Sequence, residues 1–213
     1  MADTIERMTF ECIQAVCKNL IAKKDLLNDL DAVMGDGEHG SNIERSYGMV
    51  QDALPQIEEL SAGEMIDKTG SLLLAAGGGT ATTLMGFACK KTATQMKNIS
   101  GHTSSDYAQV IKKTWESIQK KSQANVGDKT LMDAYTPAVQ AFEKAADGQK
   151  SITECFLEAG EAAEKGAAET SNMIAKRGRG YYVGERGIGT CDPGAVSVAT
   201  IFKTIGESLK EMK

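Results

Sequence analysis

The chain lacks long hydrophobic runs, a signal-like start and any excess of basic residues. No apolar stretch approaches the roughly 20 residues that a membrane span requires, and Met1 to Thr4 show no basic-then-apolar signal pattern. The net charge is −5, whereas nucleic-acid-binding surfaces need clustered Lys and Arg. We therefore expect a cytoplasmic protein that binds neither membranes nor nucleic acids.

The five cysteines also lack the spacing of a disulfide framework or a zinc site. They are scattered, odd in number and without a CxxC pair, which is typical of reduced cytosolic thiols. At 213 residues, the chain is long enough to bury one substantial core, so a single domain over 1–213 is expected.

Period-2 alternation is absent as well, and helical spacing of apolar residues dominates. The one strand-like patch is Tyr181-Tyr182-Val183. Capping boxes at Ser61–Glu64 and Ser151–Glu154 each precede an apolar periodic run. The pattern predicts an all-α fold of about eight amphipathic, antiparallel helices. Besides the two helices after these boxes, helices are expected over 4–24, 42–54, 80–97, 104–121, 129–146 and 193–211.

Four glycine-rich or polar breaks interrupt the helical pattern. They cover 35–40, 77–80, 127–130 and 178–194. In an up-and-down array of helices, alternate connections lie at the same end. The order of the breaks therefore predicts that all four form a single site at one end of the molecule.

The first break carries three carboxylates among glycines. Asp31, Asp36 and Glu38 supply the oxygen ligands that Mg²⁺ prefers. Directly after them, Ser41-Asn42-Ile43-Glu44 matches a capping box, which predicts a helix N-terminus beside the metal. A cation next to such an anion-binding helix end suits a phosphate-handling site. The alternative interpretation is an acidic surface turn.

The next two breaks each precede a predicted helix. The run Gly77-Gly78-Gly79-Thr80 lets backbone N–H groups approach an anion, although the Gly-Lys-Ser/Thr of a Walker loop is missing. In Gly127-Asp128-Lys129-Thr130, Asp128 is expected to be the N-cap. Each break has an alternative: a tight turn for the first, and a capped helix start with a solvated Lys129 for the second.

The last break holds the densest arginine group, Arg177, Arg179 and Arg186. An arginine here is suited to neutralise phosphate charge, or else these arginines pair with Glu185 and solvent. The segment 176–194 is expected to lack regular structure of its own. Asp192-Pro193 fits an N-cap followed by proline at the first helical position.

Together these four segments, in this order, resemble the L subunit of bacterial dihydroxyacetone kinase, the nucleotide-binding subunit. The resemblance covers nearly the whole chain. It implies a closed eight-helix barrel that holds ADP or ATP through two Mg²⁺ ions in loops at one end. It places the magnesium on Asp31, Asp36 and Glu38. Nucleotide contacts fall on His39, Gly40, Ser41, Asn42, Gly78, Gly79, Thr80, Ala81, Leu131, Arg179, Asp192, Pro193 and Gly194.

The resemblance further implies that dihydroxyacetone is carried by a separate K-type subunit and that an M-type phosphotransferase-system subunit recharges the bound ADP. No general base stands among the four loops, which fits a base on the partner. Arg179 is the expected catalytic residue, stabilising charge on the phosphoryl group. The oligomeric state stays open, with a homodimer as one option.

Two positions depart from the family pattern. Glu38 stands where a third aspartate is usual, and Ala81 removes a hydroxyl expected to face a phosphate, a role open to Thr80 or Thr82. These departures motivate one alternative to the dihydroxyacetone kinase hypothesis, a kinase subunit for another ketose or polyol. Two further alternatives are a nucleotide-loaded regulatory binding module and a metal-dependent hydrolase, since a water could enter the same site.

Overall fold

The computed structural model describes residues 4–212, which form ten α-helices, three short 3₁₀ helices and no β-strand. The predicted all-α class is confirmed. The α-helices are α1 (Ile5–Ile21), α2 (Lys24–Met34), α3 (His39–Asp52), α4 (Leu54–Ile57), α5 (Ala62–Ala76), α6 (Gly79–Met96), α7 (Ser104–Ser122), α8 (Met132–Asp147), α9 (Ile152–Glu169) and α10 (Pro193–Glu211). The 3₁₀ helices are η1 (Thr170–Asn172), η2 (Arg179–Tyr182) and η3 (Gly184–Gly187).

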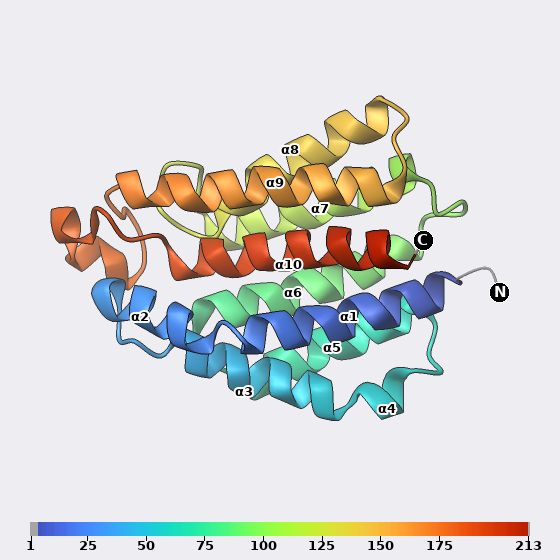
Figure 1. Ribbon diagram of the computed structural model, residues 1–213, viewed down its shortest axis with the longest axis horizontal. Helices are drawn as coiled ribbons and strands as arrows, with labels where there is room; N and C mark the ends of the chain where they lie inside the picture. The colour runs from blue at the N-terminus through green and yellow to red at the C-terminus, as the bar shows by residue number, and fades with distance from the viewer. Residues whose placement is uncertain (1–3, 213) are drawn as a thin grey trace.

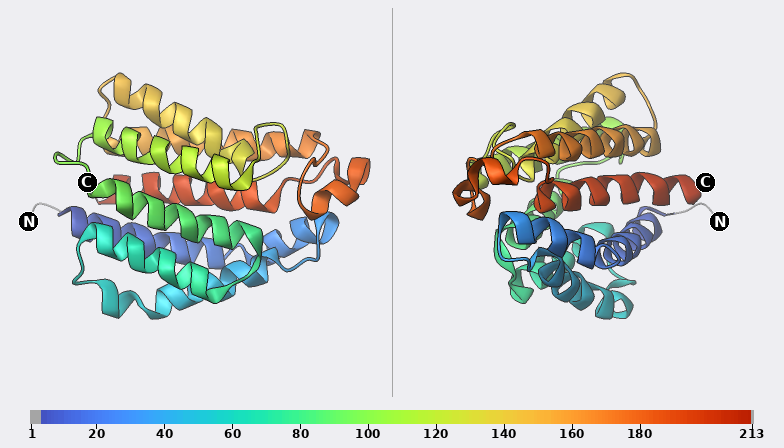
Figure 2. Two further views of the ribbon diagram at one scale, coloured as in Figure 1. Left: turned by 180° about the vertical axis from the view of Figure 1, so that it is seen from behind. Right: turned by 60° about the vertical axis from the view of Figure 1, so that its left-hand side comes forward.

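Eight of the helices in this range close into a ring (Figures 1 and 2). Each packs on the next in the order α1, α3, α5, α6, α7, α8, α9 and α10, and α10 returns to α1. These are the eight helices that the periodicity predicts, and their closed antiparallel arrangement agrees with the expected barrel. The start of α1 and the end of α10 lie at the same end (Figure 1).

Local signals account for several of the helix starts. Ser61 and Glu64 form a reciprocal capping box at α5, and Ser151 and Glu154 form one at α9. The predicted N-cap of α10 is also present, because the Asp192 side chain accepts the Ala195 N–H. Helices α2 and α4 are not predicted by the sequence pattern, and they lie in the connections that join the ring helices.

Glycines let α9 pack very closely on both of its neighbours in the ring. A Cβ at Gly166 would lie 2.1 Å from the backbone oxygen of Asp133 on α8. That carbonyl lacks its usual helical partner because Pro137, four residues on, has no N–H. On the other side, a Cβ at Gly160 would lie 2.8 Å from Lys203 Cα on α10. Only glycine permits this spacing at both positions.

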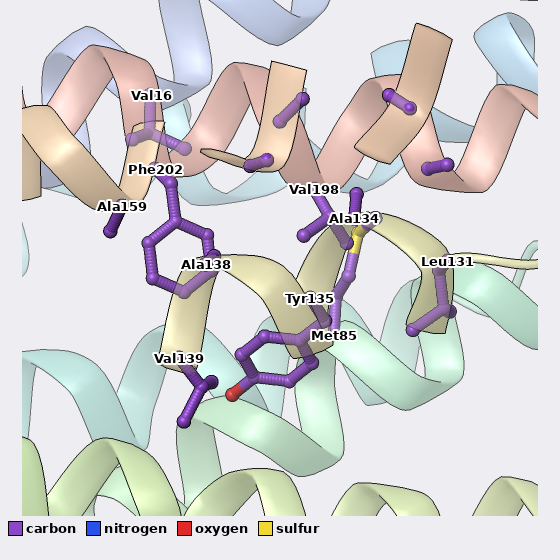
Figure 3. Packing of buried hydrophobic residues seen from close by; sticks show 14 of the residues in the cluster. Val16, Met85, Leu131, Ala134, Tyr135, Ala138, Val139, Ala159, Val198 and Phe202 are labelled. Carbon is purple, nitrogen blue, oxygen red and sulfur yellow. The ribbon is translucent and has the colours of Figure 1, made fainter. Parts of the chain in front are cut away.

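The interior of the barrel is filled by apolar side chains from all sides of the ring. Figure 3 shows Phe202 of α10 and Tyr135 of α8 within this core, and their ring centroids lie 5.6 Å apart. A mostly apolar cavity of about 330 Å³ remains inside, lined among others by Cys12, Tyr47 and Cys89. Within residues 4–212, no helix is both long and apolar enough to cross a bilayer.

The glycine contacts give a paired stability prediction. Replacing Gly166 by Ala forces a methyl group against the α8 backbone, and we expect a net loss of about 2 kcal/mol in unfolding free energy. Gly48→Ala on α3 meets open space, so the helix propensity of Ala should instead stabilise the protein by up to about 1 kcal/mol. Urea denaturation measures both, and equal effects of the two changes would contradict the packing argument.

Candidate functional site

The four breaks lie together at the end of the barrel opposite the start of α1, as predicted (Figure 2, right). Direct contacts connect them. The Met34 side chain, just before the first break, lies 3.0 Å from the point where a Cβ atom on Gly180 in the last break would stand. The Asn42 side chain, just after the first break, lies 3.1 Å from the corresponding point at Gly78 in the second break. Lys129 Nζ donates to the Gly187 carbonyl, which joins the third break to the last.

The carboxylate of Asp31 caps helix α3 from a neighbouring helix. Asp31 stands in the last turn of α2, and its Oδ2 accepts the backbone N–H groups of Glu38 (3.0 Å) and His39 (3.2 Å). Helix α3 therefore begins at His39 with Glu38 as N-cap. A carboxylate at a helix N-terminus is favoured by the positive end of the helix dipole.

The predicted capping box at Ser41 is accordingly wrong. Ser41 already lies in the first turn of α3, and its side chain is bound to α2 instead: Asn28 Nδ2 donates to Ser41 Oγ, and Ser41 N–H donates to Asn28 Oδ1, both at 3.0 Å. The two helix starts approach so closely that a Cβ at Gly40 would lie 1.9 Å from the Lys24 carbonyl. Gly40 is thus required for this crossing.

The three carboxylates predicted to bind metal belong to one short stretch but differ in their contacts. Asp36 pairs with Arg179 in the last break, whereas Glu38 is exposed. A Cβ at position 35 would lie 2.5 Å from Asp31 Oδ1, so Gly35 leaves that oxygen open. Within residues 4–212, no three His, Cys, Asp or Glu side chains converge as a metal cluster. The magnesium assignment stays a prediction.

His39 connects the acidic stretch to α10. Its Nε2 lies 2.9 Å from Ser197 Oγ, and Ser197 Oγ donates to the Pro193 carbonyl. Since a serine hydroxyl has one proton, His39 Nε2 must be the donor to Ser197 and Nδ1 is left as an acceptor. Burial lowers the pKa of His39, although the nearby Asp31 carboxylate opposes this. The ring is therefore held in its neutral form near pH 7.

The glycine loop ends in an uncapped helix N-terminus. Gly77, Gly78 and Gly79 all have positive φ, and α6 begins at Gly79 without a side-chain cap. The backbone N–H groups at this end have no intrahelical partners, which suits them to bind an anion. Of the hydroxyls that could replace the one missing at Ala81, Thr80 is exposed, whereas Thr82 is buried and its Oγ1 lacks a hydrogen-bond partner.

The predicted N-cap at Asp128 is wrong, because α8 begins later, at Met132. Asp133 instead accepts the N–H groups of Gly127 and Thr130, at 2.5 and 2.7 Å, and this closes the preceding turn. Asp128 accepts the Asn125 N–H at 2.9 Å and pairs with Arg177 in the last break. Burial opposes its ionisation, but the Asn125 N–H and Arg177 outweigh that effect and lower its pKa.

Lys129 is buried and not solvated, contrary to the alternative considered for this break. Its side chain is only 2% exposed, and its Nζ donates to the carbonyls of Met173 (3.1 Å) and Gly187 (2.6 Å). Burial lowers its pKa, and the Asp192 carboxylate counteracts this. A buried cation is costly unless it is hydrogen-bonded, so these two carbonyls fix Lys129 as an anchor for the last break.

The last break contains more regular structure than expected, because η2 and η3 lie within it and include the strand-like Tyr181 and Tyr182. Its arginines do not pair with Glu185. Arg177 binds Asp128 and Arg179 binds Asp36. Each contact ties the segment to another break, so the salt bridges are part of the site's architecture.

The start of α10 closes the site from the side of the third break. A Cβ at Gly194 would lie 3.4 Å from Leu131 Cβ, which places these two predicted nucleotide contacts side by side. Burial raises the pKa of Asp192 to about 7, and the carboxylates of Asp133 and Asp31 contribute in the same direction. Two neighbouring carboxylates therefore help to raise the pKa of Asp192, an effect that a bound cation would relieve.

Sequence reasoning missed three residues that shape this end of the barrel: Asn28, Lys129 and Ser197. Asn28 and Ser197 lie outside the breaks, in helices, and contact the site only through the fold. For Lys129, the sequence does not indicate its burial, because a lysine in a polar loop gives no sign of it. These roles arise from contacts between segments distant in sequence.

Comparison with known proteins supports this fold. Residues 33–207 match the family model of the DAK2 domain. The chain is 30% identical to the Escherichia coli protein named PEP-dependent dihydroxyacetone kinase, ADP-binding subunit DhaL, over 89% of this chain and 90% of that protein. It is 34% identical to the L-erythrulose 1-kinase of Mycolicibacterium smegmatis, over 93% of this chain but 34% of the relative.

A solved structure shares the fold. The dihydroxyacetone kinase from C. freundii, in complex with AMP-PNP and Mg²⁺, superposes with a TM-score of 0.71 at 22% identity, covering 94% of this chain. This chain spans about a third (33%) of that longer protein. The ring of antiparallel helices with its loop-built end therefore defines a known class of all-α domain. The chain belongs to the DAK2-domain family.

The buried position of Lys129 leads to a prediction about the last break. In Lys129→Met, the carbonyls of Met173 and Gly187 lose their donor, and we expect a loss of about 2 kcal/mol or more in stability. Trypsin should then cleave faster after the exposed Arg177, Arg179 and Arg186, as mass spectrometry of timed digests would show. Lys120→Met, at an exposed helical position, is the control; equal cleavage rates in both variants would refute the anchoring role.

Proposed function

We propose that this chain is the nucleotide-binding subunit of a dihydroxyacetone kinase that works in the cytoplasm. It would hold ADP or ATP with Mg²⁺ at the loop end of the barrel and pass the phosphoryl group to dihydroxyacetone on a separate K-type subunit. One observation carries this proposal: the first turn of α3 lies between two chemically opposite groups. The acceptors Asp31 and Asp36 stand on one side and the uncapped N-terminus of α6 on the other.

The acidic side fits magnesium in its donor chemistry. Asp31, Asp36 and Glu38 offer only carboxylate oxygens, which are hard ligands of the kind Mg²⁺ takes, and leave room for phosphate oxygens. We propose two Mg²⁺ ions, which would neutralise charge on the phosphates during transfer. Arg179 lies against Asp36, which supports its proposed role as the catalytic residue that stabilises charge on the phosphoryl group.

The donor side fits the nucleotide phosphates. The proposed contacts come from the starts of α3, α6 and α10. Of these, the start of α6 has no side-chain cap, so its backbone N–H groups and the positive end of its helix dipole are available to an anion. Leu131 adds an apolar contact beside Gly194. The full set is His39, Gly40, Ser41, Asn42, Gly78, Gly79, Thr80, Ala81, Leu131, Arg179, Asp192, Pro193 and Gly194. The E. coli relative's name specifies an ADP-binding subunit, which supports this assignment.

A partner is proposed because the loop end carries exposed apolar side chains around the site. Tyr182 is 82% exposed and Tyr181 59% exposed, and their rings stack edge to face. Large apolar side chains at a surface mark protein interfaces, where tyrosine is enriched among energetically important residues. A K-type subunit docked there would bring the acceptor hydroxyl, and its base, to the nucleotide. An M-type phosphotransferase subunit would recharge ADP, since the E. coli relative is named as PEP-dependent.

The metal assignment is tested by Asp36→Ala. The variant should lose Mg²⁺-dependent retention of ADP through a desalting column, and ADP with Mg²⁺ should no longer raise its unfolding temperature. Stability without ligand should change by no more than about 1 kcal/mol, because the Asp36–Arg179 pair is exposed to solvent. Asp29→Ala removes an exposed carboxylate from the preceding helix, α2, and this variant should behave as the unmodified protein. Normal ADP retention by Asp36→Ala would refute the ligand assignment.

The partner and the activity are tested together with a purified K-type subunit, Mg²⁺, ATP and dihydroxyacetone. The unmodified chain should give dihydroxyacetone phosphate. Tyr182→Ser should raise the K-subunit concentration needed for half-maximal rate by about tenfold, equivalent to about 1.4 kcal/mol of binding energy, while ADP retention stays normal. Met49→Ser, an exposed apolar residue in the second half of α3, is the matched control.

The same assay separates the rival functions. No product from a chain that retains ADP would contradict the kinase proposal and favour a regulatory binding module. Steady phosphate release by the chain alone would favour a metal-dependent hydrolase.

Another ketose is a second candidate acceptor. The observation in its favour is the 34% identity to the relative named L-erythrulose 1-kinase, which exceeds the 30% identity to the E. coli dihydroxyacetone kinase subunit. In a two-subunit kinase the acceptor pocket belongs to the partner, so the same nucleotide subunit serves either sugar. A panel of ketoses with the cognate partner distinguishes the two.

A further inference from the structure

Helix α3 presents an arginine, Arg45, to the glycine loop. This arginine is not part of the proposed nucleotide contact set. Arg45 stands three residues after Asn42, so the two side chains share one face of the helix. Its Nη2 donates to Asn42 Oδ1 at 2.8 Å. The same Nη2 lies 2.9 Å from the Cβ position of Gly78, whose φ is +113°. The guanidinium thus packs directly on the loop, and only glycine admits it.

This contact determines which way the Asn42 amide faces. A guanidinium has donors and no acceptor, so it can hydrogen-bond only the carbonyl oxygen of Asn42. The amide nitrogen must then point away from Arg45. It points toward Gly79, the first residue of α6: Asn42 Nδ2 lies 3.8 Å from the point where a Cβ atom on Gly79 would stand. Without Arg45, the oxygen and the nitrogen could exchange places by a simple rotation of the side chain.

The orientation matters because the free backbone groups at the start of α6 are donors. The first N–H groups of α6 have no side-chain cap, and they bind anions and not amide N–H groups. An Asn42 with its oxygen toward Gly79 would place an acceptor beside the anion and repel it. With the nitrogen there, the side chain adds two N–H donors to the same site.

Arg45 also retains its full positive charge. Arg177 and Arg179 are each neutralised by an aspartate, whereas Arg45 forms no ion pair with a carboxylate among residues 4–212. The adjacent acidic residue, Glu44, pairs with Lys24 instead. In a protein of net charge −5, an unneutralised cation beside the glycine loop makes the local potential favourable for a polyanion.

We propose that Arg45 is a positioning residue of the nucleotide site, which holds the Asn42 amide with its N–H₂ group directed at a phosphate bound on the N-terminus of α6. This rests on the proposed function, since it assumes that a nucleotide occupies this end of the barrel. Arg45 acts mainly through Asn42. Replacing Arg45 should therefore cost one charge-assisted hydrogen bond, the one between the Asn42 amide and the phosphate.

The test is a double-mutant cycle on ADP affinity, measured by isothermal titration calorimetry with Mg²⁺. Arg45→Met should weaken ADP binding about tenfold, and Asn42→Ala by a similar factor. In the Asn42→Ala background, Arg45→Met should have an effect of less than about twofold, because the amide it orients is gone. Arg45→Lys retains a donor for Asn42 Oδ1 and should restore most of the affinity.

The controls separate this role from general effects on charge or folding. Lys68→Met removes the same charge from an exposed site on α5 and should leave ADP affinity unchanged. All variants should unfold at the same temperature without nucleotide, since Arg45 is exposed. Normal ADP affinity in Arg45→Met would overturn the positioning role. So would an equal loss of ADP affinity on Arg45→Met in the unmodified chain and in the Asn42→Ala background. If the unmodified chain itself fails to bind ADP, the proposed function is wrong instead.

Discussion

Because eight helices alternate in direction around a closed ring, four of the connections between them must lie at the same end of the barrel. In this chain those connections contain nearly all of the unusual residues: the acidic stretch after α2, the glycine loop before α6, the buried Lys129, and the long segment between α9 and α10. The close approach of α9 to both of its neighbours depends on glycines. The site at the loop end is therefore a consequence of how the barrel closes.

The long connection between α9 and α10 shows how such an end becomes ordered. Its large apolar side chains Ile174, Tyr181, Tyr182 and Ile188 are exposed, so polar contacts with the other connections must hold it. Lys129 binds two of its carbonyls, and Asp128 binds Arg177. Met34 packs against two of its glycines, Gly180 and Gly187. These contacts place Arg179 next to Asp36, so two residues 143 positions apart in the chain meet at one point.

Much of this architecture could be predicted from the sequence, because its determinants are local. Apolar spacing identified the eight ring helices, and the capping boxes at Ser61 and Ser151 marked true helix starts. The failures at Ser41 and Asp128 have a common cause. In each case another carboxylate, Asp31 or Asp133, takes the free backbone N–H groups of the turn, and the short motif does not include this competitor. The burial of Lys129 escaped prediction because its partners, the carbonyls of Met173 and Gly187, are distant in sequence.

The first turn of α3 concentrates the remaining chemistry. Its N–H groups face the Asp31 carboxylate, its His39 side chain reaches Ser197 on α10, and its Asn42 faces the glycine loop. A metal–phosphate complex carries both signs of charge, so its site needs acceptors and donors a few ångströms apart. Helix α3 separates two such groups, because the Asp31 carboxylate, which comes from α2, lies at its N-terminus, whereas Arg45 stands in its second turn. The rigid helix thus keeps Asp31 and Arg45 from pairing.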